Sequence, residues 1–143
     1  MALIVDSGAI VSIYSHSEIW HEAFVRVVSE ERLRVIPASN LSEIDYVLAA
    51  KVDRAARDAF LDDIRREVFA IEPPTMADFS RIAQLLADYA DLDLGLADAS
   101  VVATAERIGT ERILTTDLRN FRVVRSKWGR PFRLLPWDEE HSH

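Results

Sequence analysis

Leu3-Ile4-Val5 is a short, uninterrupted apolar run near the start of the chain, and Asp6 closes it. A run of this kind is typical of a strand that is buried on both faces in the middle of a sheet. In an open α/β sheet the ligand crevice lies outside the carboxyl ends of the strands, so this pattern places Asp6 where chemistry occurs. A second interpretation stays open at this point, because Asp6 could also cap a helix beginning at Ser7.

Length and composition predict one globular domain. The chain has 143 residues, of which 49% are hydrophobic and 29% charged, and no Pro/Gly/Ser-rich linker divides it. It has no cysteine, which excludes disulfides, thiolate nucleophiles and zinc sites built on sulfur. The first apolar run is too short for a signal peptide or a membrane span, so we expect a cytoplasmic protein without membrane contact.

The charge is distributed unevenly along the chain. The net charge is −7, which by itself argues against binding nucleic acid. Between Arg107 and Arg133, however, eight basic residues stand against two acidic ones. The sequence therefore predicts a polarised molecule with one basic segment.

Apolar spacing predicts strands that alternate with helices. Beyond the first strand, strands are expected at Leu33–Ile36, Phe69–Ile71, Arg112–Thr116 and Phe132–Leu135, and helices at Ile19–Ser29, Leu41–Val52, Asp53–Val68, Thr75–Asp91 and Leu96–Ile108. This order, without tight hairpins, indicates βαβ units. We expect an α/β fold with a central, mainly parallel sheet of four or five strands, flanked by helices. The domain is expected to span residues 1–137, followed by a disordered acidic and histidine-containing tail at 138–143.

Four acidic residues fall at equivalent places in this pattern. Asp6 and Asp117 end predicted strands, whereas Glu43 and Asp98 lie in the first turns of predicted helices. Strand carboxyl ends and helix amino ends share one edge of such a sheet, so the four side chains can converge. Close carboxylates repel by roughly 1 to 4 kcal/mol per pair, and hard cations such as Mg²⁺ or Mn²⁺ neutralise them. The pattern predicts metal-assisted attack of water on a phosphodiester.

Each acid also has a purely structural interpretation. Glu43 could complete a capping box with Asn40, and Asp117 could be a turn residue. Asp98 could be a favourable charge on a helix dipole, although an unpaired Asp in so apolar a helix is costly to bury.

Four stretches resemble a known family. They are Ile4-Val5-Asp6-Ser7, Ser39-Asn40-Leu41-Ser42-Glu43, Leu96-Ala97-Asp98-Ala99-Ser100-Val101-Val102-Ala103-Thr104-Ala105 and Ile113-Leu114-Thr115-Thr116-Asp117-Leu118-Arg119-Asn120-Phe121. Together they resemble the PIN-domain ribonucleases, in particular the VapC toxins of bacterial toxin–antitoxin pairs. The resemblance implies a PIN-like fold, Mg²⁺- or Mn²⁺-dependent endoribonuclease activity, a homodimer and a VapB-type antitoxin.

The resemblance also implies roles for individual residues. Asp6, Glu43, Asp98 and Asp117 match the family's catalytic and metal-binding acids, and Ser7, Thr115 and Asn120 match supporting groups around them. Two departures stand out: Ser7-Gly8 replaces a frequent Thr-Ser, and Asn120 stands where some members carry a further acid. Mechanisms with one or two metal ions both remain open.

The leading hypothesis is an endoribonuclease toxin that cleaves tRNA or ribosomal RNA, and the alternative is a non-catalytic PIN-like module that binds RNA or protein. We expect a basic rim for RNA beside the acids, formed by Arg119, Arg122, Arg125 and Lys127. Trp128 either stacks on a base or fills the core beside Phe132. The antitoxin is expected on an uncovered apolar face of Ile19, Trp20, Phe24 and Val28, or on the neighbouring helix Leu41–Val52.

Overall fold

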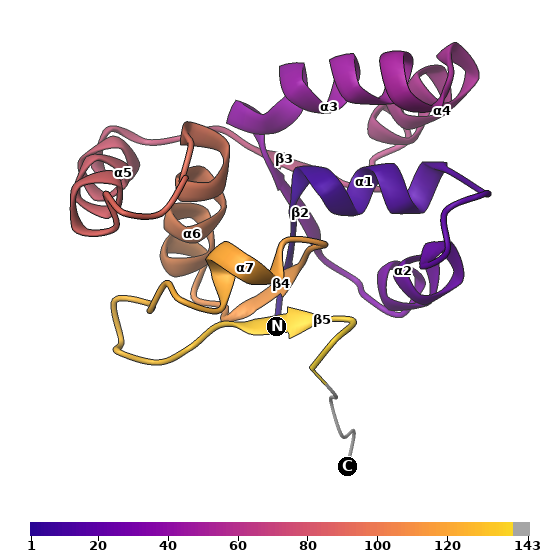
Figure 1. Ribbon diagram of the computed structural model, residues 1–143. Helices are drawn as coiled ribbons and strands as arrows, with labels where there is room; N and C mark the ends of the chain where they lie inside the picture. Colours follow the sequence, from indigo (N-terminus) through magenta and orange to yellow (C-terminus); the bar gives the residue numbers. More distant parts are fainter. Residues whose placement is uncertain (139–143) are drawn as a thin grey trace.

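A computed structural model describes residues 1–138. The fold contains one five-stranded sheet with the strand order β3-β2-β1-β4-β5 (Figure 1). The strands are β1 (Leu3–Val5), β2 (Arg34–Pro37), β3 (Ala70–Glu72), β4 (Arg112–Leu114) and β5 (Arg133–Leu135). Every neighbouring pair is parallel, and β1 lies in the centre between β2 and β4. The predicted α/β fold with a parallel sheet is confirmed.

The helical elements differ from the sequence prediction at several places. They are α1 (Ser7–Tyr14), α2 (His21–Ser29), the 3₁₀ turn η1 (Ala38–Asn40), α3 (Leu41–Val47), the π-helical turn η2 (Leu48–Val52), α4 (Arg54–Arg65), α5 (Met76–Asp88), α6 (Leu96–Ile108) and α7 (Leu118–Phe121). The helix expected at Leu41–Val52 is divided into α3 and η2, and α2 begins two residues later than expected. The short helix α7 was not predicted.

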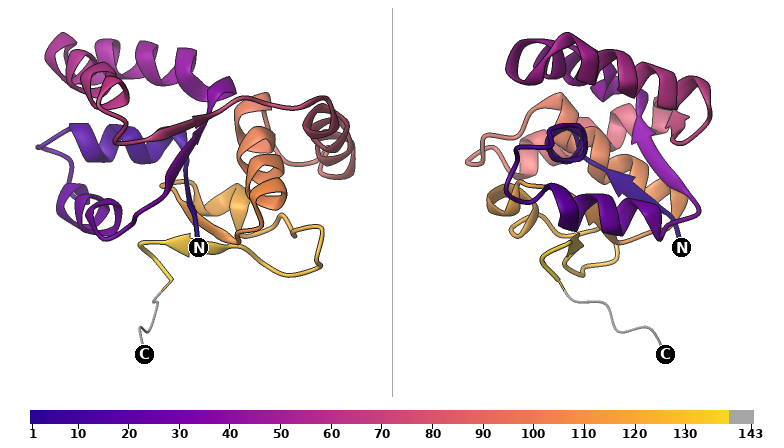
Figure 2. Two further views of the ribbon diagram at one scale, coloured as in Figure 1. Left: turned by 180° about the vertical axis from the view of Figure 1, so that it is seen from behind. Right: turned by 90° about the vertical axis from the view of Figure 1, so that its right-hand side faces the viewer.

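The helices form two layers, one on each face of the sheet (Figures 1 and 2). Successive residues of a strand point to opposite faces, so Leu3 and Val5 pack with α1 to α4 whereas Ile4 packs with α5, α6 and α7. All three side chains are fully buried. This two-sided burial explains why β1 is apolar throughout and places its carboxyl end in the interior.

Local capping sets where three of the helices begin or end. The Asp53 carboxylate accepts a hydrogen bond from the Ala56 backbone at 2.7 Å, and Thr75 and Asp78 form a reciprocal capping box at the start of α5. Gly109, with a φ of 90°, ends α6 in the left-handed conformation that glycine adopts without strain. These caps explain where α4 and α5 begin and where α6 ends.

A buried ion pair holds α5, α6 and the segment after α7 together. The Glu106 carboxylate on α6 is almost fully buried and accepts two hydrogen bonds from Arg81 of α5, at 2.8 and 2.9 Å. It also accepts a bond from the Lys127 backbone N–H at 2.7 Å. These bonds fix the carboxyl-terminal end of α6.

The end of the described chain is attached to β5. Asp138, which the sequence prediction assigned to the tail, accepts a bond from the Leu134 backbone at 2.7 Å and pairs with Arg122 at 2.8 Å. Its carboxyl pKa is lowered, chiefly by the hydrogen bond from Arg122. The ordered part therefore includes Asp138, and the rest of the predicted tail lies outside the described residues. No helix in the described chain is long and apolar enough to cross a membrane.

We predict that Arg81→Met destabilises the protein by about 3 to 5 kcal/mol, because it leaves the Glu106 carboxylate buried without its counter-charge. Urea unfolding at pH 7 measures the change. Arg66→Met is the control, because Arg66 forms an exposed ion pair with Asp62, and pairs of this kind contribute about 1 kcal/mol or less. Equal losses in the two variants would contradict the role of this ion pair.

Candidate active site

Asp6 is a buried carboxylate at the end of the central strand. It is 5% exposed, and the Thr115 hydroxyl donates a hydrogen bond to its Oδ2 at 2.8 Å. Burial, followed by the nearby charges of Asp98 and Asp117, raises the Asp6 pKa to about 7, although the Thr115 hydrogen bond acts in the opposite direction. Asp6 occupies the N-cap position of α1, and its backbone carbonyl accepts a bond from the Ala9 N–H, but its carboxylate makes no capping hydrogen bond.

Asp98 lies in the first turn of α6 and is half-buried. Its Oδ2 accepts a hydrogen bond from the Gly95 backbone at 3.1 Å, which holds the side chain at the helix amino end. Burial raises the Asp98 pKa, and the charges of Asp117, Glu43 and Asp93 raise it further. The carboxylate therefore caps its helix and also lies in the field of other acids.

Asp117 is joined to Asp6 through Thr115. The Thr115 hydroxyl, which donates to Asp6, accepts a bond from the Asp117 backbone N–H at 2.8 Å. The Asp117 carboxylate caps α7 by accepting bonds from the Asn120 backbone at 3.1 Å and from the Asn120 amide at 3.2 Å. Asp117 therefore has a local structural role, because its carboxylate caps α7. Its charge also raises the pKa values of Asp6 and Asp98.

Glu43 is exposed on the first turn of α3. The Asn40 side chain makes no capping hydrogen bond there, so the predicted capping box is wrong. Glu43 contributes to the raised pKa of Asp98, which shows that its charge acts on the same site. Asp98 and Asp117 therefore act on Asp6, and Asp117 and Glu43 act on Asp98. Within residues 1–138, however, no three His, Cys, Asp or Glu side chains are arranged as a ready-made metal site.

Gly8 explains one departure from the family pattern. A Cβ at this position would clash with the Thr116 hydroxyl. The Thr116 side chain, which follows β4, therefore occupies the space that a larger residue at position 8 would need.

The buried polar atoms without partners belong to residues close in sequence to the acids. Among the described residues, these atoms belong to Ser7, Asn40 and Ser100. Each of the three lies within three residues of Asp6, Glu43 or Asp98. Unpaired buried polar groups are rare in native proteins and point to a bound water, ion or ligand. Oxygen ligands, mutually repelling charges and these groups together fit a hydrated divalent cation.

Only the first part of the basic segment lies near the four acids. Arg119 lies in α7, two residues after Asp117, and its side chain makes no ion pair or hydrogen bond with the described residues. The Arg122 guanidinium pairs with Asp138, and the Arg125 guanidinium donates to the Arg122 backbone carbonyl at 2.8 Å. Lys127 is bonded through its backbone to Glu106, about 12 Å along α6 from Asp98. The segment therefore begins near the acids and leads away from them.

Trp128 does not fill the core. Its side chain is 38% exposed, with the Lys127 ammonium 5.4 Å and the Arg130 guanidinium 5.8 Å from its ring centre. The interpretation of Trp128 as a core residue is wrong, because its side chain is exposed. The two cations over its ring form cation–π contacts instead.

The profile of the PIN domain matches residues 3–127, and the chain belongs to this family. Among its relatives, Ribonuclease VapC26 of Mycobacterium tuberculosis is 28% identical over 135 residues, which cover 94% of this chain and 100% of the relative. The resemblance to VapC proteins noted in the sequence is therefore supported across nearly the whole chain.

Two solved structures share the fold. The crystal structure of Mycobacterium tuberculosis VapC20, a toxin that cleaves the sarcin–ricin loop, has a TM-score of 0.73 and 17% identity, covering 82% of this chain and 92% of that one. A toxin–antitoxin complex from Klebsiella pneumoniae has a TM-score of 0.65 and 17% identity, covering 87% of this chain and 92% of that one.

We predict that Asp6→Asn stabilises the metal-free protein at pH 8 but not at pH 4. The folded-state pKa is raised from 3.8 to about 7, so ionisation of Asp6 removes stability as the pH rises between these values. The gain reaches at most about 4 kcal/mol above pH 7. Urea unfolding in EDTA at pH 4, 6 and 8 measures it, with the exposed α4 variant Asp58→Asn as control. A gain independent of pH would contradict the prediction.

Proposed function

We propose that the protein is a metal-dependent endoribonuclease toxin of the VapC type, which cleaves tRNA or ribosomal RNA and is neutralised by a cognate antitoxin. The observation that carries this proposal is that the charges of Asp98 and Asp117 act on the buried Asp6, and that the Thr115 hydroxyl bonds to both Asp6 and Asp117. The charge of Glu43 acts in turn on Asp98. The names of the similar proteins support the same class of activity. RNA of this kind is cytoplasmic, which is the compartment we propose.

The four acids would hold Mg²⁺ or Mn²⁺. When bound, the ion would activate a water molecule and stabilise the oxygens of the phosphodiester. Thr115 orients the Asp6 carboxylate, and Asn120 holds that of Asp117. Glu43 is exposed and makes no hydrogen bond with the described residues, so its side chain could rotate toward the other acids when the ion neutralises them.

The arrangement favours an enzyme over a binding module. Keeping Asp6 buried near two other carboxylates costs stability above its raised pKa. A module that only docks RNA gains nothing from this cost, because phosphates are repelled by carboxylates. The cleavage experiment below decides between the two.

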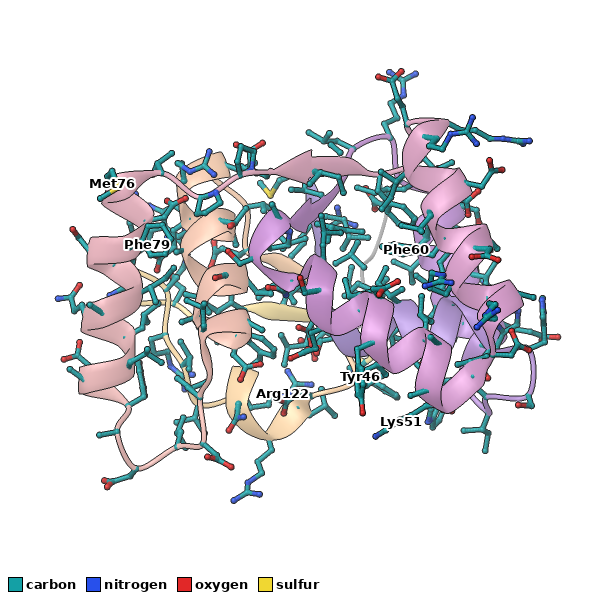
Figure 3. The ribbon with its side chains drawn as sticks, turned by 90° about the horizontal axis from the view of Figure 1, so that it is seen from above. Tyr46, Lys51, Phe60, Met76, Phe79 and Arg122 are labelled. Carbon is teal, nitrogen blue, oxygen red and sulfur yellow. The ribbon has the colours of Figure 1, made fainter. Side chains whose placement is uncertain are left out.

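We propose that a VapB-type antitoxin covers exposed apolar side chains near α2 and α3. The expected face was partly wrong, because Phe24 and Val28 are buried in the core with Trp137 and the sheet. Ile19 is 82% exposed and Tyr46 is 71% exposed. Figure 3 shows Tyr46 and Lys51 projecting from the helical stretch of α3 and η2. We also propose a homodimer.

Asp6→Asn and Asp98→Asn are each expected to reduce Mg²⁺-dependent RNA cleavage roughly a hundredfold or more, since each removes one ligand charge. Gel analysis of total cellular RNA incubated with purified protein measures cleavage and maps the cut sites. Asp88→Asn, on the exposed side of α5, is the control and should cleave at the wild-type rate. Wild-type cleavage by both site variants would refute the assignment of the site, and an inactive wild-type protein that binds RNA would favour the binding module.

For RNA binding we propose Arg119, Arg122, Arg125 and Lys127. Arg119 is expected to contribute most, because its guanidinium has no ion-pair partner among residues 1–138 and lies two residues from Asp117. Arg119→Ala should weaken RNA binding and lower the log–log salt slope by about 0.7, the value for one lost phosphate contact on a single strand. Fluorescence anisotropy at several salt concentrations measures both quantities. Arg65→Ala, at an exposed position of α4, is the control. Equal slopes for the two variants would contradict the prediction.

A further inference from the structure

Asn40 is a buried amide without hydrogen bonds. Its side chain is 0% exposed, and neither Oδ1 nor Nδ2 has a partner among the described residues. Leaving a buried donor or acceptor unpaired costs about 1 to 3 kcal/mol per group. Capping does not explain the residue, because Asn40 makes no side-chain bond to α3.

The position of Asn40 in the fold connects it to the acids. It ends η1, which follows β2 at the same sheet edge where β1 ends in Asp6. Glu43 follows one turn later on α3. The turn η1 packs directly against both α3 and α6, the two helices that carry Glu43 and Asp98.

Ser100 gives a second, independent indication on the opposing helix. It lies two residues after Asp98 on α6, is 2% exposed, and its hydroxyl also has no partner. Two unpaired polar side chains thus lie on elements that pack together, and each element carries or directly precedes one of the acids. A carboxamide offers two donors and an acceptor, and a hydroxyl offers one donor and two acceptor sites, so both groups suit water.

We propose that Asn40 is a positioning residue for the divalent cation, an inference that rests on the proposed nuclease function. Its carboxamide, assisted by the Ser100 hydroxyl, holds water of the ion's hydration shell and thereby fixes α3 relative to α6, so that Glu43 and Asp98 serve the same ion. Asn40 does not contact RNA, because none of its surface is exposed. Groups that support metal ligands in this way change metal affinity or activity by 10- to 100-fold when they are replaced.

Asn40→Leu tests the proposal, because leucine has a similar shape and no polar atoms. In EDTA the variant should melt at the same temperature as the wild type or higher, since an unpaired amide is removed. Its Mn²⁺ affinity, measured by titration calorimetry of the whole chain, should be 10- to 100-fold weaker. Cleavage should recover at high metal concentration, which a defect in folding would not allow.

Two further variants complete the experiment. Ser100→Ala is a smaller change that keeps α6 intact, and it should weaken Mn²⁺ affinity about tenfold even if Asn40→Leu does not fold. Thr104→Val is the matched control, because Thr104 is buried on the same helix one turn farther from Asp98, and its Mn²⁺ affinity should equal that of the wild type.

The possible outcomes separate the two proposals. Wild-type Mn²⁺ affinity in Asn40→Leu and Ser100→Ala would overturn the role of Asn40 while leaving the nuclease proposal intact, provided that Asp98→Asn loses binding. Equal losses in Ser100→Ala and Thr104→Val would also overturn it. If the wild-type protein binds no Mn²⁺, both proposals fail.

Discussion

The carboxylate of Asp6 is buried at the end of a strand that is itself enclosed on both faces. Removing this charge from water is costly, and Asp98 and Asp117 add repulsion, so ionisation near neutral pH opposes folding. The rest of the fold offsets this cost: the apolar core around β1 is anchored by Leu3, Ile4 and Val5, and Thr115 supplies a hydrogen bond where water is excluded. A bound cation would relieve the repulsion directly, which couples the proposed function to stability.

The helix α6 connects this site to the remainder of the molecule. Its first turn carries Asp98, and its buried rear half carries Glu106, which is fixed by Arg81 and the Lys127 backbone. Because the helix is rigidly held between α5 and the sheet, the position of Asp98 is set by contacts well away from the acids. On the other side, the Thr115 hydroxyl, which is bonded to Asp6, holds the Asp117 backbone. The acids are therefore held by packing on several elements and not by contacts among themselves.

Much of this could be predicted from the sequence, because the decisive signals are local. The apolar run at Leu3–Val5, the Thr75/Asp78 capping box and the glycine at the end of α6 each identify an element without knowledge of its neighbours. The helix α7 was missed because it has only four residues and is formed by the cap that Asp117 provides. The local pattern indicates a cap at Asn40 and gives no signal at Ser100, because an unpaired buried group is a property of tertiary packing. The burial of Phe24 likewise depends on Trp137, which is distant in sequence.

The ionisation of Asp6 is the property on which the account depends most directly. Carbon-13 NMR of the protein labelled at aspartate carboxyl carbons, with Asp6→Asn used to assign the signal, measures the Asp6 pKa with and without Mg²⁺. The account predicts a pKa of about 7 without the ion and a lower pKa when Mg²⁺ is present. A pKa near 4 that does not respond to Mg²⁺ would contradict both the burial of this charge and its role in binding a cation.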